Sequence, residues 1–155
     1  MPRIGITGHT RLSREAATFT LETLTAVLRE RADPDLHGVT CLARGADQLF
    51  ARAVLAARGT YEVVLPAEDY QERIVDRADR RTFDELLGKA TAVRTMPFRR
   101  SSRTAYLAAS TDMLDRCEVL FAVWDGGPSL GVGDTAHVVS MARARRIPVE
   151  VFWPG

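Results

Sequence analysis

The residues best suited to chemistry lie in a glycine-rich segment between an apolar run and a helical pattern. Its members are Asp125, Gly126, Gly127, Gly131, Gly133, Asp134 and Thr135. Glycine lets backbone N–H groups turn toward an anion, and the positive end of the following helix adds to the attraction. The segment therefore predicts a site for a phosphate or a ribose, with Thr135 adding a hydroxyl. A tight strand-to-helix turn is the alternative explanation for the glycines.

Three other polar segments follow predicted strands and complete the candidate site. They contribute Gly8, His9, Arg11, Arg44, Gly45, Asp47, Arg99 and Ser101. Arginine meets a phosphate through a planar, bidentate guanidinium, and Gly8 would let the backbone approach a ligand. His9 is suited either to a ligand contact or to a structural hydrogen bond. Asp47 is suited either to a helix N-terminus or to ribose hydroxyls, and Tyr106 either to stacking on a base or to the core.

The elements that must position these loops form an alternating pattern of short apolar runs and amphipathic segments. Strands are predicted at 3–7, 39–43, 61–65, 92–96, 118–124 and 149–153, with 118–124 central in the sheet. Helices are predicted from a cap at Ser13 to Asp33-Pro34, at 46–57, 103–116 and 134–145, with one or two exposed helices within 68–89. The predicted fold is a single α/β domain over 1–155, Rossmann-like and doubly wound, with a mainly parallel sheet and helices on both faces. Ligands of such sheets bind at the carboxyl ends of the strands, where the four loops converge.

Composition excludes several classes of protein. The chain has 155 residues, 46% hydrophobic and 26% charged, as expected of a globular protein. Its formal net charge is +1, which argues against binding to bulk nucleic acid. Neither a signal peptide nor a membrane-spanning segment is recognisable, so we expect a cytoplasmic protein. Cys41 and Cys117 are expected to be free thiols, and with three scattered histidines they predict no metal site.

The first glycine-containing loop also excludes two common nucleotide-dependent activities. A G-x-G-x-x-G fingerprint lacks its third glycine because Arg11 stands there, and Arg44 ends the second strand in place of the acid that holds an NAD ribose. The chain contains no G-x-x-x-x-G-K-[ST] sequence. We therefore expect neither NAD-dependent hydride transfer nor ATP hydrolysis by a P-loop, and no cofactor.

Taken together, these loops resemble the SLOG superfamily, the Rossmann-like nucleotide-binding domains that include the DprA and Lonely Guy proteins. The resemblance rests on residues 4–9 (IGITGH), 45–47 (GAD), 105–106 (AY), 120–126 (LFAVWDG) and 131–136 (GVGDTA). It spans nearly the whole chain, and the glycine-rich segment is its most specific part. It implies a parallel sheet, a nucleotide-derived ligand in these loops and a homodimer or higher oligomer.

The sequence departs from the enzymes of this superfamily at the position of their catalytic carboxylate. The phosphoribohydrolases carry P-G-G-x-G-T-x-x-E, and the residue that corresponds to this Glu is Val138, while Asp134 replaces the glycine before Thr135. Valine can neither attack an anomeric carbon nor stabilise an oxocarbenium-like transition state. The sequence thus predicts a protein that binds or senses a nucleotide-derived small molecule. The alternatives are an N-glycosidic hydrolase that uses Asp134, Asp125 or Asp47, and a binder of single-stranded DNA, which suits the arginines but not the net charge.

Overall fold

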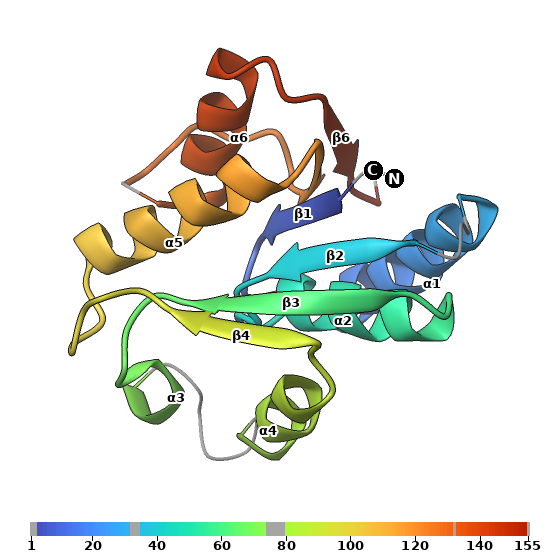
Figure 1. The fold of residues 1–155 in the computed structure, drawn as a ribbon. Coiled ribbons are helices and arrows are strands. Elements are labelled where there is room, and N and C mark those ends of the chain that lie inside the picture. Colours follow the sequence, from blue (N-terminus) through green and yellow to red (C-terminus); the bar gives the residue numbers. More distant parts are fainter. Residues whose placement is uncertain (1–2, 32–34, 74–79, 132, 155) are drawn as a thin grey trace.

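Six parallel strands form one sheet in the computed structural model, which describes residues 3–31, 35–73, 80–131 and 133–154 (Figure 1). The strands are β1 (Arg3–Gly8), β2 (His37–Thr40), β3 (Thr60–Leu65), β4 (Ala92–Thr95), β5 (Val119–Val123) and β6 (Val149–Phe152). Their order is β4-β3-β2-β1-β5-β6, and every pairing is parallel. The predicted doubly wound sheet is confirmed. The expectation that 118–124 is central needs correction, because β5 is an interior strand but has only β6 between it and the edge.

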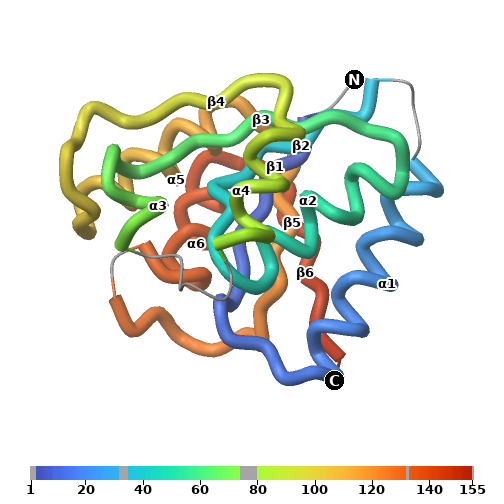
Figure 2. The backbone as a smooth tube through the Cα atoms, turned by 90° about the horizontal axis from the view of Figure 1, so that it is seen from below, coloured from blue at the N-terminus to red at the C-terminus, as the bar shows by residue number. Residues whose placement is uncertain are grey.

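Helices cover both faces of the sheet, as Figure 1 shows. The helices are α1 (Arg14–Glu30), α2 (Ala46–Ala56), α3 (Tyr70–Arg73), α4 (Arg80–Gly88), α5 (Arg103–Arg116) and α6 (Thr135–Ala144). One face carries α1, α2 and α4, with α1 and α2 side by side (Figure 2), and the other carries α5 and α6. None of the helices within the described residues is long and apolar enough to cross a membrane.

The core forms two layers because strand residues alternate between the faces. On β5, Phe121 packs into the layer beneath α1 and α2, whereas Leu120 packs into the layer beneath α5 and α6. Gly5 allows α5 to approach β1, since a Cβ there would lie 3.0 Å from Cys117 Sγ. The apolar runs of the sequence are thus buried on both faces, as a parallel sheet requires.

Capping residues fix where the helices begin. Ser13 accepts a hydrogen bond from Ala16 N at 3.1 Å at the start of α1, as predicted, and Ser102 does the same for α5 with Ala105 N. The predicted helix stop at Asp33-Pro34 lies outside the described residues, and so does part of the 68–89 segment, in which α3 and α4 are found.

The strand order places a topological switch between β1 and β5. From β1 the chain proceeds outward through β2, β3 and β4, and it then crosses to β5 on the other side of β1. The loops after β1 and β5 consequently leave side by side, as the blue and orange segments show in Figure 2. A ligand of a doubly wound sheet binds at such a point.

Candidate functional site

A cavity of about 690 Å³ lies at the carboxyl ends of β1, β2 and β5, and we call it the main cavity. Its walls come from the end of β1, the loops after β1, β2 and β5, and helices α2, α3, α5 and α6. Eight of the predicted site residues line it: Gly8, His9, Asp47, Asp125, Gly127, Gly133, Asp134 and Thr135. Gly126 and Gly131 do not, although both belong to the same loop.

His9 joins the two loops at the switch point. Its backbone N–H donates to Val123 O at 3.1 Å, and its Nε2 accepts from Asp125 N at 3.3 Å. The imidazole also meets the Trp153 ring edge-on, with centroids 5.3 Å apart. His9 therefore has the structural hydrogen bonds that were one of its two expected roles, while its ring still lines the main cavity.

Two glycines of the site are required by packing within the protein. A Cβ on Gly8 would lie 2.4 Å from Ala46 Cβ, so only glycine lets the end of β1 touch α2. Gly45 has a φ of +83°, and a Cβ there would lie 2.6 Å from His9 O. Close packing of the β1 loop against the start of α2 accounts for both glycines without a ligand.

Several N–H groups of the glycine-rich loop, those of Gly127, Leu130, Gly131 and Gly133, already have partners from the same loop or from α6. Asp134 caps α6 by accepting from His137 N at 2.8 Å, and it also accepts from Leu130 N at 2.6 Å and Gly131 N at 3.1 Å. Although partial burial opposes ionisation, the N–H groups of His137 and Leu130 hold the pKa of Asp134 below its usual value. The carboxylate thus occupies the place that a phosphate was expected to take among these donors.

Asp125 is engaged in a similar way. Gly127 N donates to Asp125 Oδ1 at 2.9 Å, and this bond, followed by His9, holds the pKa of Asp125 below its usual value. Gly126 has a φ of +84° with open space around it, so the turn itself requires glycine there. Gly126 thus fits the alternative explanation of the glycines, a tight turn between a strand and a helix.

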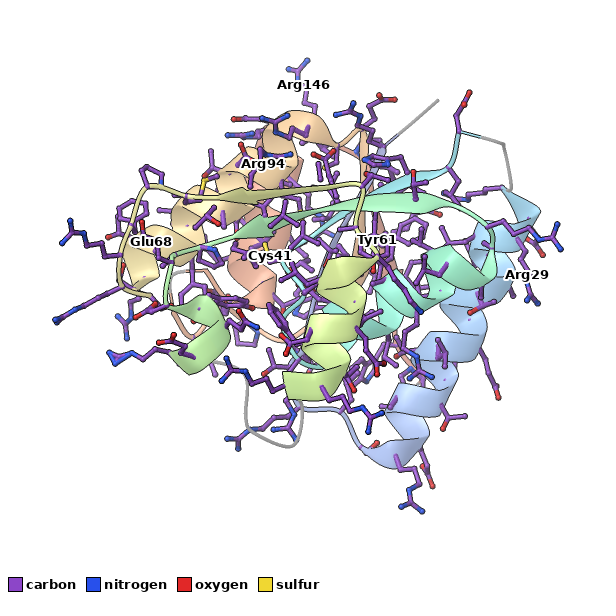
Figure 3. All side chains as sticks on the ribbon, turned by 60° about the horizontal axis from the view of Figure 1, so that its bottom comes forward. Arg29, Cys41, Tyr61, Glu68, Arg94 and Arg146 are labelled. Carbon is purple, nitrogen blue, oxygen red and sulfur yellow. The ribbon has the colours of Figure 1, made fainter. Side chains whose placement is uncertain are left out.

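Asp47 differs from the other two aspartates of the cavity. It is only 6% exposed, and Ala43 N donates to its Oδ2 at 3.2 Å. Burial raises the pKa of Asp47 to about 7. Its neighbours include the thiol of Cys41, which lies inside the fold (Figure 3) and whose pKa burial raises far above the usual value. The cavity therefore contains one acidic group that changes its charge near neutral pH.

Several cavity residues were not in the predicted site. Cys41, Tyr70 and Trp124 line the main cavity, as does Tyr106, for which stacking and core packing were both considered. The rings of Tyr70 and Tyr106 lie 6.2 Å apart and nearly perpendicular. Tyr70 belongs to a short helix far along the chain from the β1 and β5 loops, and no local motif marks it.

A second cavity of about 540 Å³, which we call the arginine cavity, adjoins the first, and Thr10 lines both. It contains the predicted residues Arg11, Arg44 and Gly45, together with Arg52, which the prediction omitted. Gln48 and Arg52 also line it, one turn apart on α2, and this i, i+4 spacing could have identified Arg52. None of the described residues that line it carries a carboxylate.

Arg99 and Ser101 line neither cavity, although Ser101 contacts Tyr106 of the main cavity wall. The N–H and Oγ of Ser101 both donate to Asp69 Oδ1 at 2.7 Å, and Arg99 O accepts from Asp69 N at 3.2 Å. The loop after β4 is thereby attached to the segment that begins α3. The structure does not bring these two residues together with the rest of the predicted site.

Comparison with known proteins gives the fold of the chain. No family model and no curated protein sequence matches it. The DNA processing protein A (DprA) of Streptococcus pneumoniae is similar in structure with a TM-score of 0.71 and 16% identity, over 99% of this chain and 50% of that one. DprA of Helicobacter pylori is similar with a TM-score of 0.68 and 16% identity, over 97% of this chain and 64% of that one. The molybdenum cofactor binding protein of Rippkaea orientalis is similar with a TM-score of 0.58 and 16% identity, over 97% of this chain and 75% of that one.

Both DprA proteins are longer than this chain, which spans half of one and less than two thirds of the other. The similarity covers nearly all of the present chain, and it includes the sheet, its helices and the loops at the switch point. The chain therefore shares the Rossmann-like fold of these proteins, as its sequence predicted.

Proposed function

We propose that this protein binds a nucleotide-derived small molecule, with its nucleoside part in the main cavity and its phosphate in the arginine cavity. The observation that carries the proposal is the division of charge between two adjoining cavities. Asp47, Asp125 and Asp134 line the main cavity, whereas Arg11, Arg44 and Arg52 line the other. A phosphate would be repelled by the first set and attracted by the second.

The size and lining of the main cavity suit a nucleoside. Cavities that bind small molecules typically measure about 300–1,000 Å³ and combine apolar walls with a few placed polar groups. Here Tyr106, Trp124 and Leu130 supply apolar surface, while Asp47 and Thr135 supply polar atoms. The glycine-rich loop contributes Gly127 and Gly133 to the wall, so it helps to enclose a ligand even though its N–H groups are engaged.

Calorimetric titration tests this proposal directly. Adenosine and guanosine monophosphates, ADP-ribose and cyclic dinucleotides form the panel, and the proposal fails if none binds at millimolar concentration to the folded protein. The variant Arg52→Ala should weaken the binding of a nucleoside monophosphate about tenfold, and leave the binding of the matching nucleoside unchanged. Arg29→Ala is the matched control, because Arg29 projects into solvent at the edge of the molecule (Figure 3).

A second candidate function is hydrolysis of an N-glycosidic bond, with Asp47 as the acid. Asp125 and Asp134 are held ionised by backbone N–H groups, whereas burial raises the pKa of Asp47 to about 7, within the range of a general acid. Val138, at the position of the enzymes' Glu, also lines the cavity. Incubation with nucleoside monophosphates followed by chromatography would show free base if this function is real.

Single-stranded DNA is an alternative ligand, because the H. pylori DprA binds it. The R. orientalis protein instead binds a small molecule, the molybdenum cofactor. The arginine cavity would suit the DNA backbone, but the net charge of +1 does not favour an extended polyanion. Steep salt dependence of oligonucleotide binding would favour DNA over the small ligand. A cytoplasmic location and a homodimer remain predictions.

A further inference from the structure

The wall of the main cavity around Asp47 has the composition of a base-binding pocket. Asp47 comes from α2, Cys41 directly follows β2, and Tyr70 and Tyr106 come from α3 and α5. All four residues line the same cavity, and the ring centroids of Tyr70 and Tyr106 lie 6.2 Å apart. A Cβ on Gly133 would lie 3.7 Å from Tyr106 Cβ, so Tyr106 connects this wall with the glycine-rich loop.

The carboxylate of Asp47 has hydrogen-bonding capacity that the protein does not use up. The backbone N–H groups of Ala43 and Cys41 approach it, the first at 3.2 Å from Oδ2. An ionised carboxylate has about four acceptor positions on its two oxygens. Asp134, in contrast, accepts from three backbone N–H groups and from Ser129 Oγ. Asp47 therefore has more remaining acceptor capacity than Asp134, and it is buried, whereas the Asp125 side chain is 51% exposed and can be solvated by water.

We propose that Asp47 selects ligands with a 2-amino-4-oxopyrimidine edge, the edge shared by guanine and pterins. This inference rests on the proposed binding function and names its substrate class. Such an edge presents two adjacent N–H donors, the ring N–H and the exocyclic amino group, which match the two oxygens of one carboxylate. Paired bonds of this kind are charge-assisted and short.

The other bases present the wrong pattern to a carboxylate. The Watson–Crick edges of adenine and cytosine place a ring nitrogen acceptor beside the amino donor, so the lone pair of that nitrogen would face a carboxylate oxygen. Uracil and thymine present a single N–H between two carbonyl oxygens. A site built to pair with donors rejects ligands that lack them, because its polar atoms would be left buried without partners.

The arrangement of α2 fits a ligand oriented in this way. Asp47 at its first turn faces the main cavity, whereas Arg44 before it and Arg52 further along it line the arginine cavity. One helix thus supplies both the proposed base-binding carboxylate and the proposed phosphate-binding cation. Thr10 lies between the two sites, since it lines both cavities.

Titration of the wild-type protein with GMP, AMP and XMP tests the proposal. We expect GMP to bind at least about a hundredfold more tightly than AMP or XMP. Asp47→Asn replaces one acceptor by an amide donor, which complements the 2-oxo group of XMP, so this variant should prefer XMP to GMP. Asp115→Asn is the matched control, because Asp115 is an exposed carboxylate that pairs with Arg145 and lines neither cavity, and this variant should retain the preference for GMP.

Neopterin distinguishes the two sources of the edge. Tight binding of GMP alone identifies a nucleotide, and tight binding of neopterin alone identifies a pterin, supporting the edge recognition but overturning the nucleotide proposal. Equal affinity for GMP and AMP overturns the inference and leaves the proposed function standing. An Asp47→Asn variant that loses affinity for all probes equally also overturns the inference, because a purely structural role of Asp47 would have that effect. Failure of GMP, AMP, XMP and neopterin overturns the inference, and failure of ADP-ribose and the cyclic dinucleotides as well overturns the proposed function.

Discussion

Asp47 and Glu62 are two buried carboxylates, 6% and 5% exposed, whose pKa values shift in opposite directions. Glu62 on β3 accepts from His37 at 3.1 Å and Arg3 at 3.4 Å, and it pairs with Arg94, which reaches from β4 toward α5 (Figure 3). Burial opposes its ionisation, but Arg94 and then His37 hold its pKa below the usual value. Among the described residues, Asp47 accepts hydrogen bonds from the backbone N–H groups of Ala43 and Cys41, and burial raises its pKa to about 7.

The difference separates structural charge from charge that is available to a ligand. At Glu62 the cations come from the protein, so the pairing is complete and extends through Arg94 to Asp112 of α5 at 2.8 Å. At Asp47 no arginine or lysine is among the described residues that line the cavity. A buried carboxylate without a cation destabilises the folded state when it ionises, and a ligand that donates to it removes that penalty.

Removing the structural carboxylate should have the largest effect. Glu62→Gln removes the carboxylate that His37 and Arg94 share and leaves Arg94 with Asp112 alone, so we expect the free energy of unfolding near pH 7 to fall by about 3 kcal/mol. Urea denaturation measures this loss. Glu150→Gln is the control, because the Glu150–Arg31 pair is exposed, and it should lose less than about 1 kcal/mol. Similar losses in both variants would show that Glu62 is no more important than a surface charge.

Asp47→Asn should act in the opposite direction and depend on pH. The folded chain holds the Asp47 proton more tightly than the unfolded chain, so wild-type stability falls as pH rises from about 4 to about 7 and stays lower above it. The variant lacks this fall. Near pH 8 it should be more stable than wild type by about 2 kcal/mol, and near pH 4 it should match it. Urea denaturation of both proteins near pH 4 and near pH 8 measures this difference in the free energy of unfolding. A variant that is less stable than wild type near pH 8 would contradict the argument that burial of the Asp47 charge is unfavourable.

Much of the fold could be predicted because the signals are local. Alternating apolar runs indicate the six strands, Ser13 indicates the start of α1, and parallel strands bring their following loops to one edge. The site was less predictable because its partners come from distant segments. The loop N–H groups were expected to bind phosphate, but Asp134 takes three hydrogen bonds that depend on the folded shape of the loop. Likewise, only the fold brings Tyr70 beside Asp47, and only the fold attaches Ser101 to Asp69.

Ligand affinity should sharpen the contrast through its dependence on pH. The ionised form of Asp47 accepts two N–H bonds, so guanosine should bind about tenfold more weakly near pH 6 than near pH 8. Guanosine replaces GMP here because it has no phosphate to titrate. Cys41 after β2, Tyr70 on α3 and Tyr106 on α5 line the cavity with Asp47, and burial raises the pKa of each, so none of them ionises in this range.

The control for that experiment is the cavity histidine. His9→Gln should preserve the pH dependence, and Asp47→Asn should abolish it. If instead the His9 variant abolishes it, the titrating group lies at the junction of the β1 and β5 loops and not at the base-binding wall.

The smallest expected effect is on the reactivity of Cys41, which lies beside Asp47 in the main cavity. Burial chiefly raises the pKa of the Cys41 thiol, and the charge of Asp47 raises it further. Because the thiolate is the reactive form, Asp47→Asn should speed the alkylation of Cys41 by iodoacetamide about threefold near pH 8. Cys117, whose pKa burial raises to about 11 on the α5 side of the sheet, is the internal control and should be unaffected. Equal acceleration at both cysteines, resolved by mass spectrometry, would indicate general loosening of the fold; acceleration at Cys41 alone would locate the unpaired charge in the cavity.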